Sequence, residues 1–96
     1  MTFEIRLTPE AEETFEELVI QLRRRWGDKF VKKFEERVEK SLQTISSTPF
    51  IYPVTEEITD ARKCILHKNC SMIYQVNGSI VRIICFWDNR QDPLIS

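Results

Sequence analysis

The chain of 96 residues is long enough for a single modest core, so we expect one domain over residues 1–96. With 42% hydrophobic and 30% charged residues, its composition is typical of a globular protein and excludes a disordered one. No apolar run is long enough to cross a bilayer, the N-terminus lacks a signal-peptide pattern, and the three cysteines lack metal-site spacing. We therefore expect a cytoplasmic protein without membrane contact, metal or cofactor.

The net charge of −1 conceals an uneven distribution. Residues 1–60 contain nine Lys and Arg against thirteen Asp and Glu, whereas residues 61–96 contain five against two. The C-terminal part is therefore basic, and it favours an anionic partner such as an acidic peptide or a phosphate backbone. The excess is smaller than that of a dedicated nucleic-acid-binding domain.

The N-terminal part predicts a strand followed by a helix. Residues 2–7 alternate between apolar and polar side chains, which is the pattern of a half-buried strand. Thr8 and Pro9 suit the N-cap and the first helical position, and acidic residues follow in the first turn. Apolar residues at spacings of three and four then predict an amphipathic helix as far as Trp26.

A second helix is predicted to follow directly. Gly27 suits the end of the first helix, and Asp28 suits the cap of the next. The second apolar stripe ends before Pro49, which cannot continue a helix. We expect a loop from there to about Glu57, held in place by the packing of its apolar side chains rather than mobile.

Three strands are predicted in the C-terminal part, at about Ile58–His67, Cys70–Val76 and Ser79–Trp87. The last two are joined by Asn77 and Gly78, a pair that favours a two-residue type I′ turn because both positions need positive φ. The predicted order of elements is β-α-α-β-β-β.

The register of this hairpin predicts which face of the sheet binds a partner. With Asn77 and Gly78 as the turn, Tyr74 faces Val81 and Cys70 faces Cys85, which makes one face apolar. The other face is mixed, so we expect the helices to leave it open for partner contacts or chemistry. It carries Ser71, Gln75 and Arg82, and its alternation extends to Phe86, Asp88 and Arg90.

Several basic residues are candidates for this open face. Arg62, Arg82 and Arg90 could bind an anion there, with Lys63, His67 and Lys68 nearby; alternatively they only keep an exposed face soluble. His67 could act as a general base at neutral pH or have a structural role, and Asp88 could be an acid–base group or a turn residue. The sequence contains no Gly-rich phosphate loop, catalytic triad spacing or metal signature.

The order of elements, the loop "PFIYP" at residues 49–53, the strand "SMIYQV" and the exit "FWDNRQDP" together resemble one family. They are similar to the RelE/ParE superfamily, the plasmid-stabilisation-type toxins of bacterial type II toxin–antitoxin modules. The resemblance covers essentially the whole chain. It implies an α+β fold, in which an N-terminal helical hairpin packs on one face of a small antiparallel sheet.

The resemblance also implies a function. Members of the RelE branch are ribosome-dependent mRNA endonucleases, members of the ParE branch inhibit DNA gyrase, and a cognate antitoxin neutralises each toxin. In the RelE branch the site has two arginines and a C-terminal tyrosine. Arg90 matches the second arginine, but Ser71 occupies the position of the first, and no tyrosine follows Pro93.

Two of three RelE-type positions therefore do not match, and RNA cleavage needs both a proton acceptor and fixed cations. The candidate catalytic residues are Arg90, Arg62, His67 and Arg82, and the candidate target- or antitoxin-binding residues are Lys63, Lys68, Ser71, Gln75 and Asp88. We expect a toxin that inhibits growth by binding a target such as gyrase. The alternatives are an mRNA endonuclease with a non-standard catalytic set, and a degenerate toxin that acts only as a binding partner or corepressor.

Overall fold

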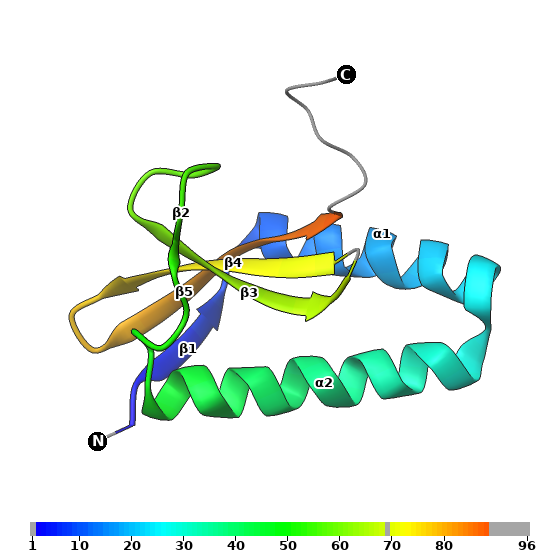
Figure 1. Ribbon diagram of the computed structural model, residues 1–96, viewed down its shortest axis with the longest axis horizontal. Coiled ribbons are helices and arrows are strands. Elements are labelled where there is room, and N and C mark those ends of the chain that lie inside the picture. Colours follow the sequence, from blue (N-terminus) through cyan, green and yellow to red (C-terminus); the bar gives the residue numbers. More distant parts are fainter. Residues whose placement is uncertain (1, 69, 89–96) are drawn as a thin grey trace.

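The computed structural model of the chain describes residues 2–68 and 70–88. Two helices and a five-stranded sheet form an α+β fold, as predicted (Figure 1). The elements are β1 (Glu4–Leu7), α1 (Pro9–Trp26), α2 (Asp28–Ser47), β2 (Val54–Thr55), β3 (Ala61–His67), β4 (Cys70–Asn77) and β5 (Ile80–Asp88).

The sheet differs from the prediction in two ways. Its strand order is β1-β5-β4-β3-β2, and β1 runs parallel to β5, while every other pair is antiparallel. Between β1 and β5 the chain passes through both helices and through β2, β3 and β4, and a connection of that length permits parallel pairing. The short edge strand β2 was not predicted, because two residues carry no periodicity.

Both helices cover the same face of the sheet, as predicted. In Figure 1, α1 passes behind the strands and α2 runs below them. Their buried apolar residues form one cluster with the sheet residues Cys64, Leu66, Cys70, Met72, Tyr74, Val81, Ile83 and Phe86. Within the described residues, no helix has the length and hydrophobicity that crossing a membrane requires.

The start of α1 is as predicted, but the link between the helices is not. The Thr8 hydroxyl accepts a hydrogen bond of 3.0 Å from the backbone N–H of Ala11. Gly27, at φ 89°, ends α1 and also precedes the first residue of α2. Asp28 is therefore inside the first turn of α2 rather than its cap, and its carboxylate binds Arg23 at 2.7 Å.

The turn between β4 and β5 lies one residue later than predicted. Asn77 is paired with Ile80, so Gly78 and Ser79 are the two turn residues. Gly78 has φ 60°, whereas Ser79 does not have positive φ. A positive φ at the first position alone is typical of a type II′ turn, which requires glycine only there.

A β-bulge at Ile84 changes which face the end of β5 presents. Tyr74 pairs with Ile83 and Ile73 pairs with Cys85, which leaves Ile84 as an extra residue. Beyond the bulge, Phe86 points toward the helices and packs on Phe15 at a ring distance of 5.0 Å. The prediction that placed Cys85 on the helix side and Phe86 on the open side is therefore wrong.

The segment before β2 is held by packing only in part. Phe50 and Ile51 are each 60% exposed, and Val54 at the start of β2 is 64% exposed. Tyr52, however, packs against the main cluster, and the Phe50 ring meets the Phe3 ring edge-on at 6.5 Å. The backbone is also bound, because the buried hydroxyl of Tyr74 donates to the carbonyl of Pro49 at 2.6 Å.

Candidate functional site

The face of the sheet opposite the helices is only partly open. Ala61, Ile73 and Cys85 are buried there in a second small cluster with Ile58, Ile84 and Trp87. Ile58 belongs to the segment between β2 and β3, which therefore lies over part of this face. What remains accessible is a strip of polar side chains toward β1 and an apolar edge at Ile65, which is 67% exposed.

Lys63 and Gln75 hold this covering segment in place. The Lys63 ammonium binds the carboxylate of Glu57 at 2.7 Å, and the Gln75 amide donates to the carbonyl of Thr59 at 3.0 Å. Both side chains lie on the predicted face, but their bonds connect strands to the segment. These two bonds hold the segment between β2 and β3 over the second cluster.

Arg82 is exposed on the polar strip and has an arginine beside it. The parallel register of β1 and β5 places Arg6 directly next to Arg82 on the same face. Arg6 also binds Glu4, two residues before it on β1. The two arginines outnumber Glu4, and the net positive charge that remains favours an anionic contact at this edge of the sheet. The sequence analysis did not find Arg6, because the pairing of β1 with β5 was not predicted.

Ser71 lies on the predicted face but is fully buried. It is paired with Ile65 on one side and Trp87 on the other. A side chain without exposed surface cannot touch a partner unless the neighbours move. The position that corresponds to an arginine of the RelE branch is thus a buried position of the sheet in this chain.

Arg62 points toward the helix side, at the edge near β2. Its guanidinium donates to the carbonyls of Phe50 at 3.3 Å and Tyr52 at 2.7 Å. It also lies over the Phe50 ring, 5.1 Å from the centroid. Arg62 is therefore engaged in fixing the segment before β2.

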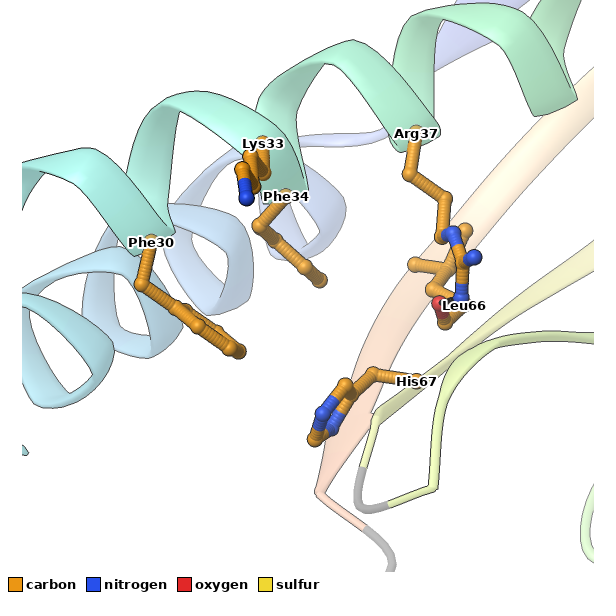
Figure 2. A pocket seen from close by; sticks show the side chains of 6 residues that line it. All are labelled: Phe30, Lys33, Phe34, Arg37, Leu66 and His67. Atoms are coloured by element: carbon orange, nitrogen blue, oxygen red, sulfur yellow. Dashed lines mark hydrogen bonds between the residues drawn. The ribbon is translucent and has the colours of Figure 1, made fainter. Parts of the chain in front are cut away.

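His67 lies at the end of β3 and faces α2. Its ring meets the ring of Phe30 edge-on at 5.4 Å. Figure 2 shows the pocket between them, into which the Phe30 and Phe34 rings extend from α2. The pocket has a volume of about 240 Å³ and is lined by Phe30, Lys33, Phe34, Arg37, Leu66 and His67. Arg37 lies at the edge of the pocket and donates to the carbonyl of Leu66 at 2.7 Å.

Asp88 is at the end of β5, paired with Cys70. Because Cys70 belongs to the helix-side cluster, the bulge has turned Asp88 away from the predicted open face. Burial raises the pKa of Asp88, and the nearby charge of Arg25 opposes this shift. Burial, with the Asp88 charge as a smaller cause, raises the pKa of Cys70 to about 11.

The predicted site residues thus do not converge on one place. Lys63, Gln75 and Arg82 share the open face, whereas His67 and Asp88 lie toward the helix side, with exposed Lys68 following His67. Arg90 lies outside the described residues. Among the described residues, no three His, Cys, Asp or Glu side chains gather as metal ligands.

The pocket between α2 and β3 was missed by the sequence analysis. Its helical members, Phe30, Lys33, Phe34 and Arg37, follow the spacing of one helix face, so the signal was present. Phe30 and Phe34 belong to the apolar stripe of this helix, and such a stripe predicts packing without marking a pocket. The end of β3 approaches this face of α2 without covering all of it, and the pocket is the part that stays uncovered.

Comparisons with known proteins identify the family and the fold of this chain. Residues 5–93 match the family described as the ParE toxin of the type II toxin–antitoxin system parDE. No curated protein sequence matches the chain significantly.

Solved structures resemble this chain in fold. A chain of the chromosomal ParDE toxin–antitoxin system from P. aeruginosa superposes with a TM-score of 0.75 at 12% identity, covering 91% of this chain and 96% of that one. A chain of the E. coli DinJ-YafQ toxin–antitoxin complex gives 0.65 at 8% identity, covering 94% and 96%. A chain of the RelBE2 toxin–antitoxin complex from Mycobacterium tuberculosis gives 0.61 at 15% identity, covering 92% and 99%.

At these identities the structural likeness establishes the fold alone, and the family match carries the assignment. That match extends from β1 into the segment beyond β5. It therefore includes the elements that form the open face of the sheet and the pocket between α2 and β3. The chain belongs to the ParE toxin family of type II toxin–antitoxin systems.

Proposed function

We propose that this protein is a toxin that arrests growth by binding a protein target in the cytoplasm, with DNA gyrase as the first target to test. The observation that carries the proposal is the match to the ParE toxin family over residues 5–93. In the RelE/ParE superfamily, the ParE branch is the one associated with gyrase inhibition.

The placement of three of the four candidate catalytic residues supports binding over RNA cleavage; the fourth, Arg90, lies outside the described residues. Attack by an RNA 2′-oxygen needs a proton acceptor and cations around the same phosphate. His67 faces α2, and Arg82 lies on the opposite face of the sheet. Arg62 is bonded to the carbonyls of Phe50 and Tyr52. These three groups therefore do not surround a common phosphate.

A cognate antitoxin is the second partner that we propose. Structures of toxin–antitoxin complexes are among those that share this fold. Two surfaces of the toxin suit an acidic or amphipathic segment, namely the pair Arg6 and Arg82 and the basic rim of the pocket between α2 and β3. Either one complements carboxylates, and the pocket adds apolar contacts.

The test is inducible expression of the chain in bacteria, with and without the protein encoded by the adjacent reading frame. We expect growth arrest that the adjacent protein reverses, an SOS response, and loss of supercoiling by purified gyrase when purified toxin is added. Transcript 5′ ends should remain unchanged.

Three other results would each redirect the proposal. Normal supercoiling in the presence of toxin would overturn gyrase as the target. New transcript ends that disappear in the Arg90→Ala variant would favour an mRNA endonuclease with a non-standard catalytic set. Normal growth without the adjacent protein would indicate a degenerate toxin that serves only as a binding partner or corepressor.

A further inference from the structure

The pocket between α2 and β3 combines an apolar floor with a basic rim. Phe34 and Leu66 are buried and form the floor, whereas Phe30 is half-buried and forms one wall. Lys33, Arg37 and His67 surround this opening. Figure 2 shows the Arg37 side chain on one side of the opening and the Phe30 ring on the other.

An aromatic surface continues from the pocket toward the end of the helical hairpin. Trp26 stacks on Phe30 with a ring distance of 5.6 Å and an interplanar angle of 27°. Trp26 is 52% exposed, although it ends the apolar stripe of α1. Covering exposed apolar area of this kind with a partner is favourable. The site therefore has room for one apolar side chain and a further surface beside it.

The basic rim favours a ligand that carries negative charge close to the apolar side chain it inserts into the pocket. Arg37 has five N–H donors, and the structure uses one of its nitrogens on the carbonyl of Leu66. That bond fixes the guanidinium at the edge of the pocket, so the other donors are positioned before a ligand arrives. Lys33 is exposed one turn earlier on α2, and His67 closes the opposite side.

These features fit a peptide better than a nucleic acid. Single-stranded nucleic acid needs a continuous basic groove with successive aromatic platforms, whereas α2 also carries the exposed carboxylates Glu35, Glu36 and Glu39, so its surface is not continuously basic. A volume of about 240 Å³ with an aliphatic and phenyl floor suits one large apolar side chain.

We propose that this pocket is the anchor point for the antitoxin, which inserts one large apolar residue between Phe30, Phe34 and Leu66. Carboxylates flanking that residue bind Lys33, Arg37 and His67. The inference rests on the proposed function, since it requires that an antitoxin exists, and it adds the chemistry of the segment that the toxin recognises.

The test uses the protein encoded by the adjacent reading frame as the probe, with affinity measured by calorimetry. Lys33→Glu reverses one rim charge at an exposed position and should weaken binding at least tenfold. Lys32→Glu is the matched control, because it makes the same change at the neighbouring exposed position outside the pocket. It should change affinity less than twofold.

His67 provides a second and independent readout. It is the only histidine of the chain, so the imidazole signals of untagged protein report on the pocket without ambiguity. They should shift when the adjacent protein binds, and a 12-residue single-stranded oligonucleotide should leave them unchanged. Shifts caused by the oligonucleotide alone would overturn the peptide assignment.

The results separate this inference from the proposed function. If the adjacent protein binds wild type and Lys33→Glu equally and leaves the His67 signals unchanged, the pocket assignment is wrong, while the toxin and its antitoxin stand. If the adjacent protein does not bind wild type and growth is normal, the proposed function fails and the antitoxin anchor fails with it.

Discussion

Tyr74 joins the centre of the sheet to the segment before β2 through a single buried hydrogen bond. Its hydroxyl donates to the carbonyl of Pro49 at 2.6 Å, and both residues are buried. Tyr74→Phe leaves that carbonyl without its partner, which should lower the free energy of unfolding by about 1–3 kcal/mol. Urea denaturation measures the loss.

A matched hydroxyl deletion distinguishes this bond from a general effect of removing a tyrosine oxygen. Tyr52→Phe removes the hydroxyl of a half-buried tyrosine near the thiol of Cys64, and sulfur accepts hydrogen bonds only weakly. We expect a smaller loss for Tyr52→Phe. Wild-type stability of Tyr74→Phe would contradict the role given to this bond.

The three cysteines are free and buried, and this predicts their reactivity. Burial raises the pKa of the Cys70 and Cys85 thiols to about 11, with smaller contributions from nearby carboxylates. At pH 8 the thiolate fraction of each is about one in a thousand, and thiolate is the reactive form.

Ellman's reagent at pH 8 should therefore react slowly with the folded protein. The unfolded chain in urea is the control, and it should release the colour expected for three thiols per chain. Rapid reaction of one thiol in the folded protein would show that a cysteine is accessible.

At the scale of elements, two threonines of the α1 segment hold the bulge of β5. Thr8 donates through its hydroxyl toward the carbonyls of Ile83 and Ile84 at 3.1 and 3.0 Å. The Thr14 hydroxyl accepts from the backbone N–H of Phe86 at 3.0 Å. A bulge leaves backbone groups without strand partners, and these hydroxyls satisfy them.

Thr14→Val should therefore cost about 1–3 kcal/mol, because the N–H of Phe86 would be buried without an acceptor. Thr44→Val is the matched control: Thr44 also donates to the carbonyl four residues earlier in its helix, but it is exposed at that bond. Amide hydrogen exchange should accelerate at Phe86 only in Thr14→Val. Equal exchange in both variants would contradict the assignment.

The bulge also explains why the predicted assignment of β5 residues to the two faces of the sheet is correct at first and then fails. Asn77 and Gly78 indicate a tight turn, and strict alternation then assigns every residue of β5 to a face. The assignment is right for Arg82 and wrong from Cys85 onward, because Ile84 is inserted. No residue type in the sequence marks that insertion, since the groups that stabilise it are Thr8 and Thr14. Local patterns find strands, whereas a tertiary contact decides their register.

At the scale of the whole molecule, the helices and the order of the predicted strands follow from local patterns and from the resemblance. The site does not, because its residues meet only through long-range pairing. Arg6 lies beside Arg82 only when β1 joins the sheet next to β5. His67 meets Phe30 only when the end of β3 approaches α2. A single sequence without strand pairings does not reveal either juxtaposition.

Buried protonated groups on both faces of the sheet make the stability of the whole fold sensitive to high pH. Burial raises the pKa of Tyr74 from 10.0 to about 12, and the thiols of Cys70 and Cys85 from 9.0 to about 11. A group whose pKa is higher in the folded state contributes its full stability below the unfolded pKa and loses it as pH rises through the folded value.

The free energy of unfolding should therefore hold up to about pH 9 and fall between pH 9 and 12, by about 1–3 kcal/mol for each group. Urea denaturation at pH 7, 9, 10 and 11 follows the fall. Tyr74→Phe removes one of the three groups, so its curve should fall less steeply above pH 10 than that of wild type. A free energy that stays constant from pH 8 to 11 would contradict the burial of these three groups as protonated acids.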